Sequence, residues 1–206
     1  MDNVKEHWKL LNEIDAHLLD DLKPSQYFQS LSSPLFSFER PFTMLSRLKG
    51  IKQSPIHHPE GSVWNHTMLA IDEASKRKDQ ASDARVFMWA TLLHDIGKAV
   101  TTKRRKGKIT AYNHDLAGAE MAREFLMGFE QDPFISKVAA LVRWHMQILY
   151  LAKSRRHADL ETMRLEADIN DIALLGLCDR LGRKNVNQHA EEQSIAEFIK
   201  KAGEMG

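Results

Sequence analysis

The sequence places a histidine and a carboxylate side by side, as His94-Asp95, at the end of a strongly apolar run. The preceding residues 86–93 carry no charge, which predicts a helix that is buried on every side. A carboxylate left without a partner in such a place costs several kcal/mol, roughly. We therefore expect a cation beside this pair. The ordinary alternative is a packed core histidine next to a carboxylate that accepts backbone hydrogen bonds.

Four further residues could act with this pair, because each falls at an end or on the inner face of a predicted helix: His66, His114, His145 and Asp179. Taken alone, His145 is a core histidine on an apolar stripe. Asp179 stands inside an apolar run, where a carboxylate is either the partner of Arg180 or Arg183 or a metal ligand. Both readings of Asp179 stay open at this point.

Together these residues form a set of imidazoles and carboxylates, which suits zinc, manganese, iron, cobalt or nickel better than magnesium or calcium. Six ligands exceed the three or four of a simple zinc site. The set therefore predicts one or two divalent transition metal ions, with Asp95 as the shared ligand when two are bound. Such ions lower the pKa of bound water and neutralise charge on a phosphoryl group.

Cations near these ligands are candidates for holding a phosphate group. They are Lys98 and, beyond it, Arg180, Arg183 and the basic run 103–108. His58 lies in a loop with two prolines and could protonate a leaving oxygen. For Lys98 the alternative is a surface ion pair, and His58 and the basic run are also consistent with solvated loops.

The composition sets limits on partners and compartment. The 206 residues include 29 basic and 28 acidic ones, a balance that gives no case for non-specific binding to nucleic acid or membrane. The single cysteine, Cys178, rules out an internal disulfide framework and favours a reducing compartment. No apolar run is long enough for a bilayer span, and the first residues do not resemble a signal peptide. We expect a soluble, cytoplasmic protein with no membrane partner.

The elements that must position these residues are helices. Helical spacing of apolar residues recurs from end to end, and no alternating run is long enough to predict a strand, so the expected fold class is all-α. Gly97 is expected to end the buried helix in the left-handed conformation, and Arg155-Arg156-His157 to form an exposed turn. The expected helices cover approximately residues 4–22, 25–31, 41–50, 63–78, 84–95, 112–129, 132–149, 159–168, 172–183 and 188–201.

Four phrases of the sequence carry a resemblance to a known family: His57-His58-Pro59-Glu60-Gly61, His66-Thr67, Leu93-His94-Asp95-Ile96-Gly97-Lys98 and Asp179-Arg180-Leu181-Gly182-Arg183. In them the chain resembles the HD-domain metal-dependent phosphohydrolases, whose motif is a histidine, a His-Asp pair and a distant aspartate. Within that family it most resembles the HD region of bacterial CCA-adding tRNA nucleotidyltransferases. The resemblance runs from about residue 51 to residue 183.

The resemblance implies a helical bundle with residue roles. His66, His94-Asp95 and Asp179 match the motif, and His114 and His145 look like the further histidines of two-metal members. It implies an HD phosphohydrolase domain at 51–206 behind an N-terminal helical extension at 1–50. The extension does not resemble a nucleotidyltransferase head, so CCA addition is not expected. Thr101-Thr102 also stands where the family often has threonine-proline.

The implied activity is hydrolysis of a phosphate ester of a nucleotide or an RNA terminus by attack of a metal-bound hydroxide, with Asp95 and Lys98 as catalytic residues. The resemblance makes a 2',3'-cyclic nucleotide the first substrate to test and nucleoside monophosphates the next. Dinucleoside polyphosphates or deoxynucleoside triphosphates would use the same ligands in a different pocket. The alternative from another class is a non-enzymatic tRNA-associated or regulatory module, in which the metals only hold the helices together.

Overall fold

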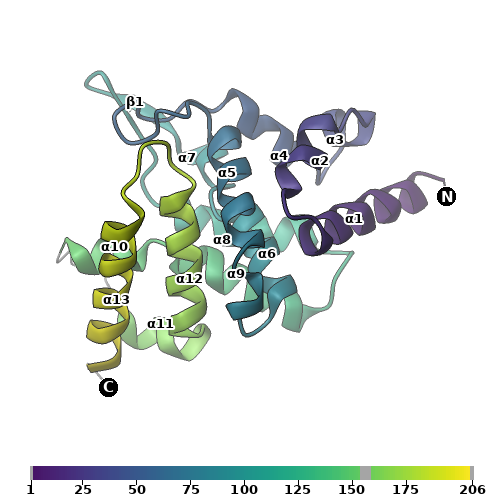
Figure 1. Ribbon diagram of the computed structural model, residues 1–206. Helices are drawn as coiled ribbons and strands as arrows, with labels where there is room; N and C mark the ends of the chain where they lie inside the picture. Colours follow the sequence, from purple (N-terminus) through teal and green to yellow (C-terminus); the bar gives the residue numbers. More distant parts are fainter. Residues whose placement is uncertain (1, 154–158, 205–206) are drawn as a thin grey trace.

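The chain folds into an all-α bundle with one short hairpin, as Figure 1 shows. The computed structural model describes residues 2–153 and 159–204, so the turn expected at Arg155–His157 lies outside the described residues. The all-α prediction is confirmed. The helices are α1 (Asp2–Asp20), α2 (Pro24–Ser30), α3 (Pro34–Phe38), α4 (Thr43–Ser46), η1 (Arg47–Gly50), α5 (Val63–Ser75), η2 (Lys78–Gln80), α6 (Ala84–Leu93), α7 (Lys98–Thr101), α8 (His114–Leu126), α9 (Asp132–Trp144), α10 (Gln147–Ala152), α11 (Leu160–Glu166), α12 (Ile169–Leu181) and α13 (Gln188–Glu204).

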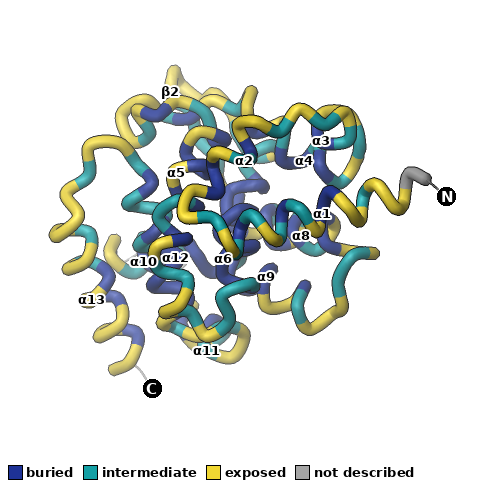
Figure 2. Tube along the Cα trace, turned by 45° about the vertical axis from the view of Figure 1, so that its right-hand side comes forward, coloured by how far each residue is buried: buried dark blue, intermediate teal, exposed yellow. Residues whose placement is uncertain are grey.

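Helix α6 is the centre of the bundle. Every residue from Val86 to Leu93 is buried, as the uncharged run predicts, and Figure 2 shows this helix inside a shell of half-exposed ones. Asp83 caps its first turn by accepting hydrogen bonds from the backbone N–H groups of Arg85 and Val86. Helices α5, α9 and α12 pack around α6, so the chain segments that carry His66, His145 and Asp179 meet one rigid element.

Gly97 does not adopt the left-handed conformation that the sequence led us to expect. Its φ is −64°, which is ordinary right-handed backbone. The reason for glycine here is close packing, because a Cβ at Gly97 would lie 2.1 Å from the carbonyl oxygen of His114 and 2.5 Å from the backbone nitrogen of Gly118. The missing side chain thus lets the start of α8 lie directly against the turn between α6 and α7.

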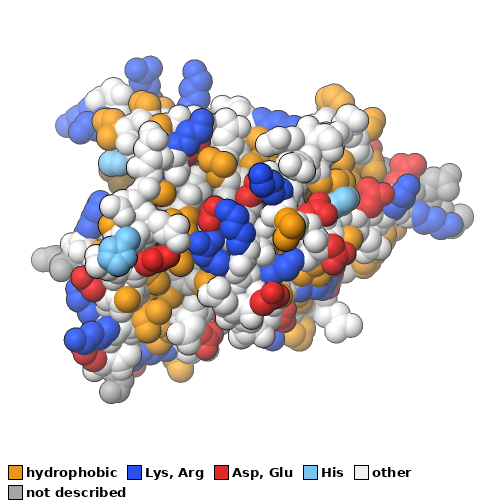
Figure 3. All heavy atoms as spheres, viewed as in Figure 1, with side chains coloured by type: hydrophobic (Ala, Val, Ile, Leu, Met, Phe, Trp, Pro, Cys, Tyr) orange, Lys and Arg blue, Asp and Glu red, His pale blue; other side chains and the backbone are white. Residues whose placement is uncertain are grey.

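The structure contains a hairpin that the sequence reading missed. Strands β1 (Lys103–Arg105) and β2 (Lys108–Thr110) pair antiparallel, with Arg104 opposite Ile109. Each strand has only three residues and the tip is exposed, so no buried face imposes an alternating pattern. Lys106 and Gly107 have positive φ, as a two-residue hairpin turn requires. Basic side chains project from this part of the surface in Figure 3.

The N-terminal helices pack on the same core as the rest of the bundle. Leu11, Ile14 and Phe28 are fully or almost fully buried members of that core. Asp15 on α1 accepts hydrogen bonds from the indole of Trp89, at 2.6 Å, and from Arg85, at 2.8 Å. The division into residues 1–50 and 51–206 stays a prediction. Among the described residues, no helix is long and apolar enough to cross a bilayer.

Candidate metal centre

Six side chains meet where several helices end. His66 lies in the first turn of α5, His94 and Asp95 follow α6, His114 is the first residue of α8, His145 follows α9, and Asp179 lies near the end of α12. The five residues other than Asp179 are buried, and the Asp179 side chain is 13% exposed. The fold therefore brings together side chains, from His66 to Asp179, that lie more than a hundred positions apart in the sequence.

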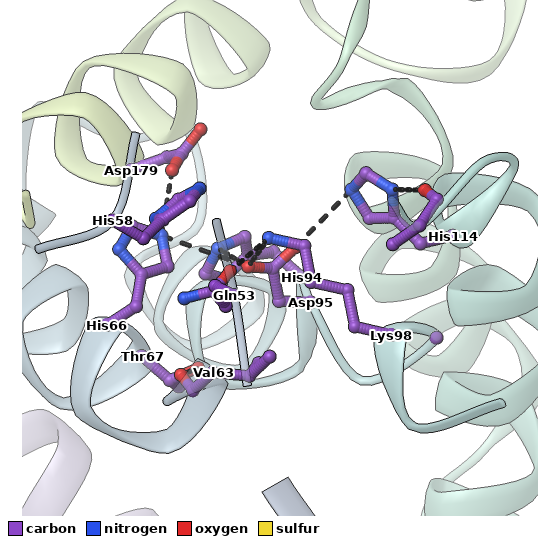
Figure 4. Close-up of polar contacts among 12 residues, drawn as sticks. Gln53, His58, Val63, His66, Thr67, His94, Asp95, Lys98, His114 and Asp179 are labelled. Carbon is purple, nitrogen blue, oxygen red and sulfur yellow. Dashed lines mark hydrogen bonds and ion pairs between the residues drawn. The ribbon is translucent and has the colours of Figure 1, made fainter. Parts of the chain in front are cut away.

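The ligand atoms form two clusters with Asp95 between them. One cluster is His66, His94 and Asp179, and the other is Asp95, His114 and His145; within each, the candidate atoms lie within 4.8 Å of one another. Asp95 Oδ2 is 3.4 Å from His94 Nε2 and 3.8 Å from His66 Nε2. Its Oδ1 is 3.4 Å from His114 Nε2. Figure 4 shows this central position of Asp95. One carboxylate oxygen thus faces each cluster, as in a bridging ligand.

Three of the histidines are oriented by the backbone. The Nδ1 atoms of His94, His114 and His145 lie 2.7, 2.7 and 2.6 Å from the carbonyl oxygen three residues earlier. Each Nδ1–H donates to that carbonyl, which leaves the lone pair on Nε2 facing the centre. The buried Nε2 atoms of His94 and His114 have no hydrogen-bond partner. Buried acceptors without donors fit a bound cation, so the residues present fit a metal site.

The surroundings of Asp95 and His145 favour the protonation states in which these two groups bind a metal. Burial alone would raise the pKa of Asp95, but Lys98 and His94 hold it well below its usual value. Burial lowers the pKa of His145 to about 4, because a buried imidazolium is poorly solvated. An ionised carboxylate and neutral imidazoles are the states that bind a divalent metal.

His66 shows how a positive charge is already accommodated here. Its Nε2 is 2.8 Å from Asp179 Oδ1 and its Nδ1 is 3.1 Å from Glu60 Oε1. Burial opposes the charged imidazole, yet these two carboxylates raise the pKa of His66. A metal ion bound at Nε2 would replace the proton that these contacts favour. Asp179 also accepts hydrogen bonds from Arg183 at 3.1 and 3.2 Å, so the ion pair considered from the sequence is present beside the cluster.

Comparison with known proteins identifies the family. The family model for the HD domain matches residues 56–184, which is more than half of the chain. The chain belongs to the HD-domain family. This is a family of metal-dependent phosphohydrolases whose members bind divalent metals, and the His and Asp clusters described above could hold such ions.

Curated relatives of this HD domain carry the name multifunctional CCA protein. The one from Halorhodospira halophila is 39% identical over 100 residues, which are 48% of this chain and 23% of the relative. The one from Alkalilimnicola ehrlichii is 29% identical over 188 residues, which are 84% of this chain and 44% of the relative. The chain therefore spans less than half the length of these relatives.

A cavity of about 260 Å³ borders the candidate metal centre. Lys98 lies at its edge, with Nζ 2.6 Å from Asp95 Oδ2 and 2.7 Å from Gln53 Oε1. Arg183 and His58 also line the cavity. Arg180 does not, because its guanidinium is held 2.8 Å from Glu191 and 2.9 Å from Ser194 on α13. The substrate-binding role expected for Arg180 therefore has no support in its position.

The sequence reading missed two residues of the site. Glu60 has a side chain that is only 1% exposed, and its Oε1 lies 2.8 Å from His58 Nδ1 as well as 3.1 Å from His66 Nδ1. Glu60 belongs to a polar loop in one of the four family phrases of the sequence. Its spacing to two histidines was the signal available for it. Gln53, which is also buried, holds Lys98 and had no signal in the sequence.

Proposed function

We propose that this HD domain is a divalent-metal-dependent phosphohydrolase that cleaves a phosphate ester of a nucleotide or an RNA terminus. The observation that carries the proposal is the position of one buried carboxylate, Asp95, which lines the cavity and has one oxygen near each of the two ligand clusters. Ligands for two adjacent ions suit a phosphoryl group, whose attacking and leaving oxygens both need stabilisation.

The metal ligands proposed are His66, His94, Asp95, His114, His145 and Asp179. When bound, divalent ions supply water of lowered pKa and neutralise charge on phosphoryl oxygens. The chain contributes fixed geometry, because backbone carbonyls orient three of the imidazoles before any ion arrives. This preorganisation reduces the cost of assembling the site.

Lys98 is the proposed phosphate contact. Its ammonium group has three N–H donors, and the contacts with Asp95 and Gln53 use two of them. The remaining donor is available to a phosphoryl oxygen in the cavity. Arg183, which lines the cavity and is held by Asp179, is a second candidate to contact the phosphoryl group.

His58 is better suited to accept a hydrogen bond than to donate a proton. Glu60 takes its Nδ1–H, which leaves Nε2 without a proton. Burial, together with the charge of Lys98, lowers the pKa of His58 to about 4. The imidazole is therefore neutral near pH 7. We assign it to orienting water or substrate instead of protonating the leaving group, a role that the sequence leaves open beside that of a solvated loop residue.

The substrate class follows from the family resemblance and from the relatives. We propose a 2',3'-cyclic nucleotide, or the same group at an RNA end, as the first substrate, with nucleoside monophosphates second. The relatives named multifunctional CCA protein support an RNA terminus as a partner. The rival function is a regulatory module with structural metals. A structural site is closed, whereas these clusters border a cavity, which favours the enzyme.

The test is hydrolysis by metal-free protein reconstituted with Mn, Fe, Co, Ni or Zn. We expect cleavage of adenosine 2',3'-cyclic phosphate with at least one of these ions, and a loss of more than about a hundredfold in Asp95→Asn. Asp171→Asn is the matched control, since Asp171 is a buried carboxylate that accepts hydrogen bonds from Ser82 away from the site. If folded, metal-loaded protein cleaves neither cyclic nucleotides nor monophosphates, the structural function replaces this one.

A further inference from the structure

A second hollow of about 860 Å³ lies beside the cavity, between the loop 50–57 and the β1–β2 hairpin. In Figure 1 these two segments lie next to each other at the upper left. The groove and the cavity share lining residues, namely Lys52, Ser54, His57, Thr102, Ile109 and Thr110. The two hollows therefore adjoin each other, and the groove lies next to the cavity that borders the candidate metal centre.

The groove is lined by unpaired positive charge. Lys52, Lys103, Arg104 and Lys108 border it, and all four are exposed. Among the described residues that line the groove, none is acidic. Figure 3 shows basic side chains standing out at the hairpin end of the molecule. In the described part of the chain these four cations form no ion pair, in contrast to basic residues such as Arg85 on the bundle surface.

This concentration of charge is local, because the whole chain has a formal net charge of only +1. Four like charges around one groove repel each other, and an anionic ligand with several charges relieves that repulsion. The loop side of the groove adds apolar surface through Pro55 and Ile56, of which Ile56 is 83% exposed. A nucleotide chain carries charged groups at regular intervals together with base faces that can pack on apolar surface, so the groove favours it over an acidic peptide.

We propose that this groove binds the phosphodiester backbone of a single-stranded nucleic acid whose terminus enters the cavity. The inference rests on the proposed function, and it goes further by making the end of a polynucleotide, and not a free nucleotide, the preferred substrate. The small volume of the cavity, about 260 Å³, favours a single chain end over a duplex. The preceding nucleotides then lie along Lys52 and the hairpin cations.

Binding is tested without catalysis, on metal-free protein. The probe is a hexaadenylate RNA with a 5'-fluorescein and a 3'-phosphate, followed by fluorescence anisotropy. Four phosphate contacts predict that log Kd changes with log salt concentration with a slope of about 3, so affinity falls about fifty-fold from 50 to 200 mM salt. Arg104→Gln/Lys108→Gln should lower that slope by about 1.4. Lys137→Gln/Lys201→Gln removes the same charge on α9 and α13 and should leave the slope unchanged.

The substrate preference is tested on metal-loaded protein by comparing kcat/KM for adenosine 2',3'-cyclic phosphate and for hexaadenylate ending in the same group. We expect at least a tenfold preference for the oligonucleotide, and a smaller preference in Arg104→Gln/Lys108→Gln than in the control. Equal kcat/KM values, binding of hexaglutamate as tight as that of the RNA, or a salt slope near zero would each overturn the groove assignment. Hydrolysis of neither substrate together with salt-dependent RNA binding would instead refute the proposed function and leave the groove intact.

Discussion

The metal centre and the hairpin groove are built in opposite ways. The centre lies at buried helix ends, and a carbonyl, a carboxylate or a cation already holds most of its polar groups. The groove has four exposed cations on a short hairpin and a loop, with no carboxylate among its described lining residues. This chain thus fixes its candidate metal ligands inside the core and leaves the cations that could contact a ligand at the surface. Changes to the interior should therefore cost stability or metal affinity, and changes to the groove should not.

The largest effect is expected from Gly97→Ala. The added Cβ would lie 2.1 Å from a backbone oxygen of His114, and a backbone cannot turn aside as a side chain can. We expect a loss of about 3 kcal/mol in unfolding free energy or more, and weaker metal binding because α8 must shift. Urea denaturation measures the first and metal titration the second. Gly118→Ala is the control, since its Cβ would lie 3.1 Å from a side-chain atom of Val142 and no closer than 3.5 Å to backbone atoms. Equal costs at the two glycines would contradict the close-packing argument.

Glu60→Gln should weaken metal binding by about ten- to a hundred-fold, with little change in fold. The carboxylate holds Nδ1 of His66, so removing its charge releases the ring from its ligand orientation. Titration of metal-free protein with Mn²⁺ gives the affinity. The control is Glu73→Gln, which removes a carboxylate on α5 that pairs with Lys76 and Arg77. An unchanged Mn²⁺ affinity would show that Glu60 has only a packing role.

Acid should destabilise the metal-free protein through His145. Its folded pKa is lowered to about 4, below that of an unfolded histidine, so the unfolded state takes up the proton first as the pH falls. Stability present above the unfolded pKa is thus lost toward pH 5, by roughly 1–2 kcal/mol. Comparing wild type with His145→Gln at pH 7 and pH 5 isolates this contribution from His66, whose raised pKa acts in the opposite direction. A parallel decline in both proteins would contradict the prediction.

The smallest change in stability is expected at the hairpin. Replacing Arg104 by Gln should alter the unfolding free energy by less than about 0.5 kcal/mol, because the side chain is exposed and unpaired. Thermal or urea unfolding checks this. A loss of several kcal/mol would mean that the hairpin cations are structural, and the contrast between core and groove would fail.

The sequence predicted the parts of the molecule that depend on burial. An uncharged run indicated α6, helical spacing put His145 on an inner face, and a buried acid marked Asp179 as needing a partner. The family motif then linked residues that periodicity alone could not bring together. The residues missed depend on tertiary contacts between distant segments: Gln53 contacts Lys98 across 45 positions, and Gly97 is required by the approach of α8. The hairpin was missed because three exposed residues per strand leave no burial pattern.

The central claim is that two ligand clusters share Asp95. Titration of metal-free protein with Mn²⁺, followed by electron paramagnetic resonance, tests it most directly. We predict two ions per chain with a spin-coupled signal, loss of the coupling in Asp95→Asn, and a single uncoupled ion in Asp179→Asn. Two uncoupled ions, or binding that Asp95→Asn leaves unchanged, would contradict the shared carboxylate.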